Sequence, residues 1–355
     1  MKRLISLFVA ITVLLLSGTS AFAGIGPMLY GVATPVTEKM KQDETLSIGI
    51  IPETMFYSIN PETGATTEIG PIGFSQCSSL DFEPETNDLF AVCRRLEDIV
   101  EEKTNAPAEG DVLVNIDLST GQGTEIGSLN MIGDKTGRVT DISFRSDGTL
   151  FAHVARVQEA KQETLTRLSP ENTNYLGVIN TQTGQLTLLG QTGLGDEFNA
   201  IGFSQADNLY HSTDDGEMGA LHMLHQTTGK ATLVQTLNYP DEFSGERLIT
   251  SMDMETVGNG LHAVLYSNLD ENGKEALETK ADPVEGFFLI SINPKSGAIE
   301  VIGETQDQIA AIAFLNRERM VQVPTLSEYG LIVTAIMLLG AAALFLRRRQ
   351  IKSGI

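Results

Sequence analysis

Short stretches in which apolar and polar residues alternate recur along most of the chain, and turn-forming residues separate them. A period of two is typical of β-strands that bury one face. One type of strand pair surrounds a Thr-Gly or Ser-Gly turn, as in "FYSINPETGATTEIG" and "FLISINPKSGAIEVIG". Glycine suits these turns because a tight hairpin needs a residue with positive φ. The turn glycines of the five such pairs are Gly64, Gly121, Gly184, Gly229 and Gly297.

A second type of strand pair follows each of the first four units. It reads, for example, "VTDISFRSDGTLFAHV" and "NAIGFSQADNLYHS". Each unit therefore predicts four short antiparallel strands. Recurrence of such a unit along one chain indicates a single repeat domain, because each unit buries its apolar face against its neighbours.

The two ends of the repeat region complement each other. The fifth unit ends with "IAAIAFL" (309–315), and no partner strand follows it, whereas the isolated strand "PMLYGVA" (27–33) precedes the first unit. We therefore predict an all-β fold, a β-propeller of about five four-stranded blades over residues 24–320, in which both ends of the chain build the last blade. A sixth, degenerate blade within 34–54 or 94–110 is one alternative. An open β-solenoid is another, but it does not account for the matched terminal strands.

Both termini carry apolar segments with basic neighbours. Residues 1–23 contain Lys2 and Arg3, an apolar run and the sequence Ala-Phe-Ala, which together predict a secretory signal peptide. An N-terminal membrane anchor is the alternative. Residues 331–346 are apolar and precede the basic tail 347–355, which predicts one transmembrane helix with its basic end in the cytoplasm and the propeller outside.

The octapeptide "VPTLSEYG" lies directly before this apolar segment, within the linker 321–330. Together with the helix and the tail, it resembles the C-terminal sorting signals called IPTL-CTERM, which occur in Gram-negative bacteria. The positions that carry the resemblance are Val323, Pro324, Thr325, Leu326, Tyr329, Gly330, Arg347, Arg348 and Arg349. Valine replaces the Ile of the motif, and tyrosine replaces its Trp.

The resemblance implies processing by an exosortase-type membrane enzyme. The protein would stay in the inner membrane transiently and then pass to the cell envelope or the outside. Retention as an unprocessed membrane anchor is the alternative.

Acidic residues dominate the segment between the termini. The chain has 46 Asp and Glu against 24 Lys and Arg, a formal net charge of −22. A surface of this kind repels nucleic acid, so we expect no nucleic-acid partner.

The chain has two cysteines, Cys77 and Cys93. An exported chain meets oxidising conditions, which favour a disulfide. A hairpin centred on Glu85 would place the two cysteines directly opposite each other, at a separation that a disulfide can bridge.

Acidic residues recur in the loops between successive units, and they are one set of candidate metal ligands. Asp134, Asp196, Asp241 and Asp307 occupy these loops, so several carboxylates could converge near a central channel and hold calcium. A second candidate is "NLDENGKEALET", in which Asn268, Asp270 and Asn272 fit the first positions of an EF-type loop. Thr279 stands where that loop needs a glutamate. Solvated acidic loops without an ion are the simpler interpretation.

No catalytic motif accompanies these loops. The histidines are scattered, and the sequence contains neither a nucleophile elbow nor a phosphate-binding glycine loop. We therefore expect a non-catalytic binding or surface-interaction module with an unidentified envelope or extracellular ligand and no cofactor. A structural component of an extracellular matrix and a calcium-assisted hydrolase or lyase are the alternatives.

Overall fold

The computed structural model describes most of the predicted repeat region. The described residues are 28–35, 52–96, 111–129, 135–159, 173–195, 200–213, 219–241, 243, 246–254, 260–268, 286–305 and 307–315. The chain divides into two units, Met1–Asn316 and Arg317–Ile355, and every described residue belongs to the first. The predicted signal peptide, sorting motif, transmembrane helix and basic tail all lie outside the described residues. Within the described ranges, no helix is long and apolar enough to cross a membrane.

The described residues form only short β-strands of three to ten residues, as the alternating pattern predicts. In chain order the strands are β1 (Met28–Ala33), β2 (Met55–Ile59), β3 (Thr66–Pro71), β4 (Ser75–Phe82), β5 (Leu89–Arg94), β6 (Asp111–Ile116), β7 (Gly123–Ser128), β8 (Lys135–Phe144), β9 (Leu150–Glu159), β10 (Thr173–Ile179), β11 (Leu186–Gln191), β12 (Ile201–Phe203), β13 (Leu209–Thr213), β14 (Ala220–Leu224), β15 (Ala231–Thr236), β16 (Glu246–Met254), β17 (Leu261–Asn268), β18 (Gly286–Ile292), β19 (Ile299–Glu304) and β20 (Ile309–Leu315).

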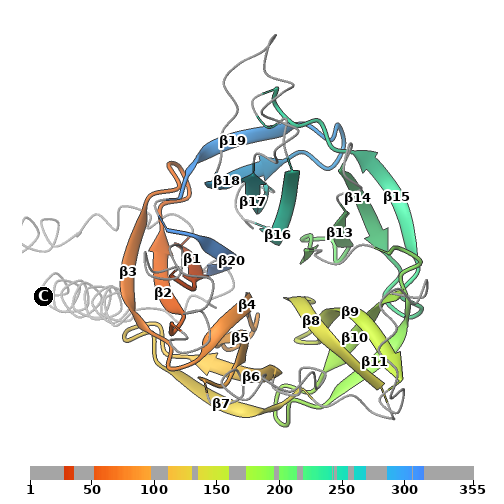
Figure 1. The fold of residues 1–355 in the computed structure, drawn as a ribbon. Helices are drawn as coiled ribbons and strands as arrows, with labels where there is room; N and C mark the ends of the chain where they lie inside the picture. The colour runs from red at the N-terminus through yellow and green to blue at the C-terminus, as the bar shows by residue number, and fades with distance from the viewer. Residues whose placement is uncertain are drawn as a thin grey trace, which may run out of the picture. The chain divides into compact units, whose positions relative to one another are not determined.

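The strands form five four-stranded antiparallel sheets arranged around a central axis as the blades of a propeller (Figure 1). The middle of the ring is here called the channel. Blade 1 contains β20, β1, β2 and β3, and blade 2 contains β4 to β7. Blade 3 contains β8 to β11, blade 4 contains β12 to β15, and blade 5 contains β16 to β19. The innermost strands face the channel, and β3, β7, β11, β15 and β19 form the perimeter (Figure 1). The predicted all-β propeller is confirmed.

Blade 1 closes the ring with strands from both ends of the repeat region. Strand β1 pairs antiparallel with β20 on one side and with β2 on the other. Met28 lies opposite Leu315, and Leu29 lies opposite Phe314. Five blades complete the ring without a sixth, and the closure excludes an open solenoid.

The hydrophobic core is divided into five clusters, one at each junction between neighbouring blades. Side chains alternate along each strand, so each blade packs one face on the preceding blade and the other face on the following blade. At the junction of blades 5 and 1, Val264 and Leu289 pack with Ile312 and Phe314, all fully buried. The closing strand β20 is thus part of the core and cannot detach without exposing it.

Glycines allow the backbones of adjacent blades to pack in direct contact at the outer edge of the ring. Gly121, in the turn of blade 2, has a φ of 81°, and a Cβ on it would lie 2.8 Å from the carbonyl oxygen of Gly70 at the end of β3. In the same way, a Cβ on Gly184 would lie 2.7 Å from the carbonyl oxygen of Gly127. Each Thr-Gly turn therefore packs on the Ile-Gly or Leu-Gly end of the preceding outer strand. The close approach, as well as positive φ, requires glycine here.

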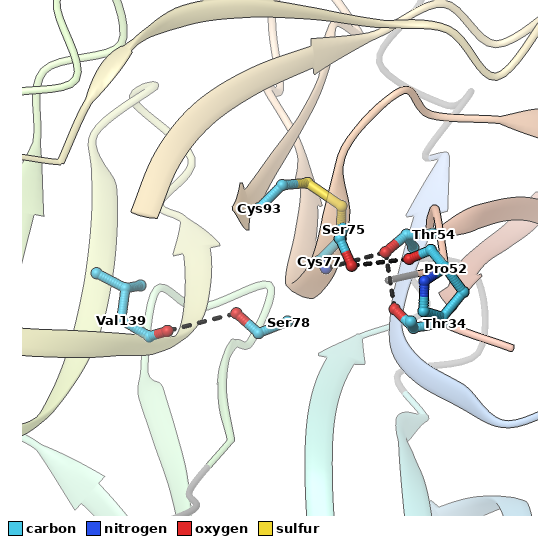
Figure 2. The surroundings of a disulfide bond; sticks show 8 residues. All are labelled: Thr34, Pro52, Thr54, Ser75, Cys77, Ser78, Cys93 and Val139. Atoms are coloured by element: carbon cyan, nitrogen blue, oxygen red, sulfur yellow. Dashed lines mark hydrogen bonds between the residues drawn. A yellow bond between two sulfur atoms is a disulfide. The ribbon is translucent and has the colours of Figure 1, made fainter. Parts of the chain in front are cut away.

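A disulfide joins Cys77 of β4 to Cys93 of β5, with Cα atoms 3.9 Å apart (Figure 2). The strand register differs from the simple hairpin that the sequence analysis assumed. Ser79 lies opposite Val92, one residue away from the expected alignment. An irregularity between Ser75 and Ser79 then brings Cys77 back opposite Cys93. The backbone N–H of Cys77 donates to Thr54 Oγ1 at 3.2 Å, which ties the bulge to the connection before β2.

Blades 3 and 4 bury a row of histidines between them. His153 of β9 lies with its ring centroid 4.8 Å from that of His211 in β13, and His222 of β14 follows at 6.4 Å. His153 Nδ1 shares a hydrogen bond of 2.6 Å with Thr140 Oγ1. Both ring nitrogens of His211, and Nε2 of His153, have no hydrogen-bond partner among the described residues.

Burial favours the neutral form of His153 and His211. It lowers the pKa of His153 to about 3 and lowers that of His211 well below its ordinary value, with further lowering from the charges of His153 and His222. A histidine whose pKa is depressed in the folded state is protonated first in the unfolded chain. The folded state therefore loses stability as the pH falls below the unfolded pKa of about 6.5.

The glycine contacts predict that Gly190→Ala destabilises the propeller by about 1–3 kcal/mol, because the new Cβ collides with the carbonyl oxygen of Thr228 in the next blade. Gly195→Ala, in the same blade, is the control. Nothing lies within 4 Å of a Cβ at Gly195, so its effect should stay within about 0.5 kcal/mol. Urea unfolding measures both, and equal stabilities would contradict the interlock.

The histidine row predicts a pH-dependent difference between the wild type and His211→Leu. The variant loses no hydrogen bond and should match the wild type at pH 7. Between pH 7 and pH 5 the wild type should lose about 2 kcal/mol more than the variant, since only the wild type must keep this imidazole uncharged. Ile201→Val, opposite His211 in the sheet, should keep the wild-type slope. Urea unfolding at the two pH values decides, and parallel slopes for His211→Leu and the wild type would refute the effect.

Candidate functional site

Three innermost strands place an aspartate at the channel: Asp81 on β4, Asp141 on β8 and Asp253 on β16. The side chains are 8%, 0% and 8% exposed, respectively. They are buried because the residues around them are apolar, as in the sequences "SLDF" and "SMDM". Each carboxylate faces the following blade, since the residues on either side of it pack on the preceding one.

Each carboxylate joins its own strand to the innermost strand of the following blade. One oxygen of Asp81 accepts the N–H of Phe82 at 2.7 Å, and the other accepts the N–H of Phe144 in β8 at 2.6 Å. The same arrangement joins Asp253 to Met254 and to Phe314 of β20, at 2.7 Å and 2.6 Å. The innermost strand has no inner neighbour, so these N–H groups need an acceptor of this kind.

Asp141 extends the pattern further around the ring. It accepts the N–H of Ile142 at 3.0 Å and that of Ile201 in β12 at 2.9 Å. The N–H of Met252 in β16 is directed at the same carboxylate. One side chain of blade 3 thereby serves backbone donors of blades 3, 4 and 5.

Serines add to these links. Ser143 Oγ accepts the N–H of Phe203 at 3.2 Å, and Ser251 Oγ accepts the N–H of Ile312 at 3.2 Å. Blades 1 and 4 depart from the pattern, because Ala311 and Ala313 occupy the equivalent positions in blade 1 and Ala200 and Gly202 occupy them in blade 4. Blade 4 therefore offers no side-chain acceptor to the innermost strand of blade 5.

Burial dominates the electrostatics of the channel carboxylates. It raises the pKa of Asp253 to about 7 and raises those of Asp81 and Asp141 well above their ordinary values. The charge of Asp253 raises the pKa of Asp81 further, which places these two carboxylates within electrostatic reach of each other. An aspartate with a raised pKa binds its proton more tightly in the folded state. Its contribution to stability is therefore lost as the pH rises from about 4 to about 7, opposite in sign to that of the histidines.

The aspartates proposed for calcium occupy other places. Asp307 Oδ2 accepts a hydrogen bond from Thr66 Oγ1 at 2.7 Å and, after burial, contributes to raising the pKa of Tyr57 to about 12. Asp241 is exposed. Asp134, Asp196, Asp270, Asn272 and the side chain of Asn268 lie outside the described residues. Within the described ranges no three His, Cys, Asp or Glu residues could hold a metal ion, so calcium binding stays a prediction for the remaining loops.

The three channel aspartates were not predicted as functional residues from the sequence. Their signal was available, because each is an acidic residue within an apolar innermost strand where the other blades carry Gly or Ala. Assigning them required knowing which backbone donors each carboxylate would meet, and those donors belong to strands about sixty residues further along the chain.

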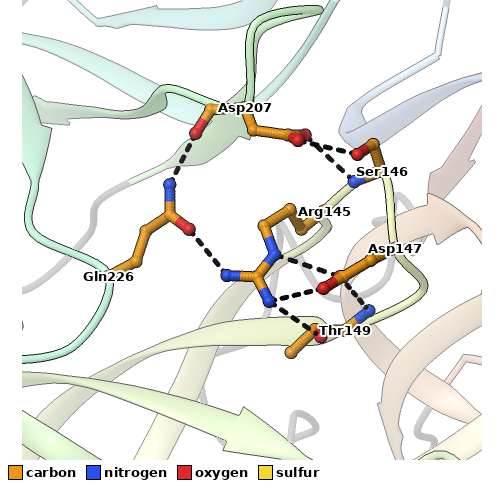
Figure 3. A network of polar contacts seen from close by, with 6 residues as sticks. All are labelled: Arg145, Ser146, Asp147, Thr149, Asp207 and Gln226. Carbon is orange, nitrogen blue, oxygen red and sulfur yellow. Dashed lines mark hydrogen bonds and ion pairs between the residues drawn. The ribbon is translucent and has the colours of Figure 1, made fainter.

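Polar contacts between turns hold blades 3 and 4 together on the face that carries the β8–β9 turn. Ser146 donates to Asp207 through its backbone N–H at 3.1 Å and through its hydroxyl at 2.7 Å (Figure 3). Gln226 Nε2 donates to the carbonyl oxygen of Asp207 at 2.5 Å, and Arg145 donates to Gln226 Oε1 at 2.9 Å (Figure 3). These contacts leave the turns of blades 3 and 4 closely joined.

Blades 4 and 5 instead leave a groove on this face, with a volume of about 920 Å³. Its walls are the β12–β13 turn of blade 4 and the β18–β19 hairpin of blade 5, and Met254, Ile292 and Ile299 lie among its lining residues. Polar contacts between these blades lie further out. The backbone N–H and the side-chain amide of Asn238 donate to the carbonyl oxygens of Gly297 and Ser296, at 2.8 Å and 3.0 Å.

The groove coincides with two departures from the repeat. Blade 4 lacks the channel acceptor, as described above. It also carries Gln235 where the outer strands of the other blades have Gly70, Gly127, Gly190 and Gly303. A groove of the described residues thus lies at the junction where blade 4 departs from the repeat in both respects.

Comparisons with known proteins bear on the C-terminal region and on the fold. Residues 322–350 match the IPTL-CTERM motif, which confirms the resemblance found in the sequence and implies export and attachment to the envelope by an exosortase-type system. No curated protein sequence matches the chain.

Solved propeller structures are similar only at a distance. The periplasmic gluconolactonase of Pseudomonas aeruginosa has 13% identity over 81% of this chain and 99% of its own, with a TM-score of 0.43. A chain of a nidogen/laminin complex has 11% identity over 81% of this chain and 98% of its own, with a TM-score of 0.42. An oligogalacturonate lyase in complex with manganese has 13% identity over 70% of this chain and 58% of its own, with a TM-score of 0.33. These likenesses indicate nothing about a ligand or reaction.

The closed ring of five blades and the matched C-terminal motif together describe the molecule. The chain is an exported β-propeller that carries an IPTL-CTERM sorting motif at its C-terminal end.

Proposed function

We propose that the protein is a non-catalytic binding module, sorted to the cell envelope, that takes its ligand in the groove between blades 4 and 5. The observation that carries this proposal is the coincidence of the groove with both departures from the repeat. Loops and turns on a rigid scaffold are where binding sites usually lie.

The channel aspartates support a structural role for the acidic residues rather than a catalytic one. Asp81, Asp141 and Asp253 each accept at least two backbone N–H groups, so both oxygens hold blades together. A substrate that displaced them would expose buried backbone donors, which costs free energy.

A hydrolase or lyase is the second candidate, because the raised pKa of Asp253 is of the kind that suits a general acid near neutral pH. A structural role in an extracellular matrix is compatible with the sorting motif as well. Substitutions distinguish the enzyme from the binding module. A change at Asp253 should abolish the activity of an enzyme, whereas a change in the groove should abolish ligand binding by the module.

The groove predicts that Ala298→Trp abolishes ligand capture. Ala298 is an exposed lining residue at the end of the β18–β19 turn, so an indole there fills the groove without entering the core. Ala65→Trp is the matched control, since Ala65 is exposed at the same position of the β2–β3 turn and accepts the equivalent backbone hydrogen bond. The mature protein, immobilised and exposed to fractionated envelope and supernatant material of its host, should capture the ligand in wild-type and Ala65→Trp form only. Equal capture by both tryptophan variants would refute the groove as the site.

The sorting motif predicts that the mature protein loses the segment from Leu331 to Ile355. Replacing Pro324 and Thr325 with alanine leaves the apolar segment unchanged, so membrane insertion should continue while recognition by the processing enzyme fails. Full-length protein should then accumulate in the inner membrane. Mass measurement of the C-terminus in the native host is the readout. Wild-type protein that keeps Arg347 to Arg349 would show that the tail is a plain anchor.

A further inference from the structure

We infer that the groove between blades 4 and 5 takes a neutral, hydroxyl-rich ligand, namely a short segment of an uncharged polysaccharide. The inference rests on the proposed function and adds the chemical class of the ligand. The lining has an apolar inner part, the floor, and a polar outer part, the rim, and both determine the ligand class.

The inner part of the groove is apolar. Met254, Ile292 and Ile299 are buried lining residues with 6%, 2% and 9% exposure, and they belong to the core cluster between blades 4 and 5. Tyr210 of β13 also lines the groove and is partly buried against the same cluster. Packing of the ring restricts its motion, so it offers a fixed aromatic surface. The apolar C–H face of a sugar ring packs well on a surface of this kind.

The rim is built from hydroxyl and amide groups. Ser204, Gln205 and Asn208 come from the β12–β13 turn, and Ser291 and Asn293 come from the β18–β19 hairpin. The side-chain oxygen of Asn293 already accepts the N–H of Lys295 at 3.0 Å, which fixes the amide in place. Hydroxyl and amide groups both donate and accept, so they pair with the hydroxyls of a sugar without requiring a charge on it.

The charges of the lining balance. Among the described lining residues, Lys295 and Glu300 carry the only formal charges; these are of opposite sign, and both side chains are exposed at the hairpin. A lining with no net charge contrasts with a chain of net charge −22. An anionic ligand would be repelled by the protein as a whole, and a cationic ligand would find more acidic surface elsewhere.

The dimensions also suit a few linked sugar rings. The volume of about 920 Å³ falls in the range of roughly 300–1,000 Å³ that is usual for small-molecule sites. A purely apolar ligand would displace water from the polar rim without replacing its hydrogen bonds, which costs free energy. A neutral oligosaccharide satisfies both the apolar floor and the polar rim.

The test is binding of the mature protein to an array of neutral and acidic glycans, followed by calorimetry with the best neutral oligosaccharide and its uronic-acid counterpart. Ala298→Trp and Tyr210→Ala should each weaken binding of the neutral oligosaccharide at least about tenfold, as expected for loss of a central anchor. Tyr210→Phe keeps the ring and should bind as the wild type does. Ala65→Trp should also bind as the wild type does, and unfolding curves confirm that each variant is folded.

The outcomes separate the ligand class from the site. Groove-dependent binding of acidic glycans or of peptides, with no neutral glycan bound, overturns the ligand class and leaves the proposed function intact. Neutral glycan binding that Ala298→Trp does not weaken overturns the assignment of this ligand to the groove. If no class of ligand binds in a groove-dependent way, both the inference and the proposed function fail.

Discussion

The backbone N–H groups along the inner edge of the ring set the constraint on which this propeller depends. An innermost strand has the rest of its blade on one side and the middle of the ring on the other, so its inner donors have no strand to pair with. Unpaired buried donors cost free energy. Short acidic and hydroxyl side chains of the preceding blade accept hydrogen bonds from these N–H groups. Asp81 and Asp253 each bind a donor of the next blade, and Asp141 reaches donors of two further blades. The spacing of the innermost strands follows from these bonds.

A second set of contacts fixes the outer wall in a different way. There the backbone of a turn lies directly on the end of the preceding strand, and the absence of two Cβ atoms sets the distance. Carboxylates at the channel and glycines at the perimeter thus determine how neighbouring blades pack against each other. Blade 4 offers blade 5 no channel acceptor, because Ala200 and Gly202 occupy those positions, and it carries Gln235 in place of the outer-strand glycine. The turn glycine Gly297 of blade 5 still packs on Thr236 of blade 4, so the outer contact persists beside the groove.

The sequence predicts the blades well because the signals for them are local. Alternation identifies each strand, the turn glycines identify each hairpin, and the unmatched strands at 27–33 and 309–315 identify the closure. Signals that depend on distant partners are weaker. The cysteine pair was visible, but the bulge that aligns Cys77 with Cys93 was not, since it depends on the contact with Thr54. The channel aspartates and the groove were not predicted at all. Both arise where two blades meet, and only the assembled ring brings their residues together.

Because β1 pairs with β20, the two ends of the propeller lie next to each other, and their position in the ring could be changed without changing the fold. Met28 and Leu315 are direct partners in an antiparallel ladder, so the first and last residues of the ring lie side by side. A short covalent link between them would turn the chain into a circle without moving a strand. New ends opened in the turn of another blade would then give a circular permutant with the same contacts. In this sense the ring has no inherent beginning, and blade 1 is the place where the polypeptide enters and leaves it.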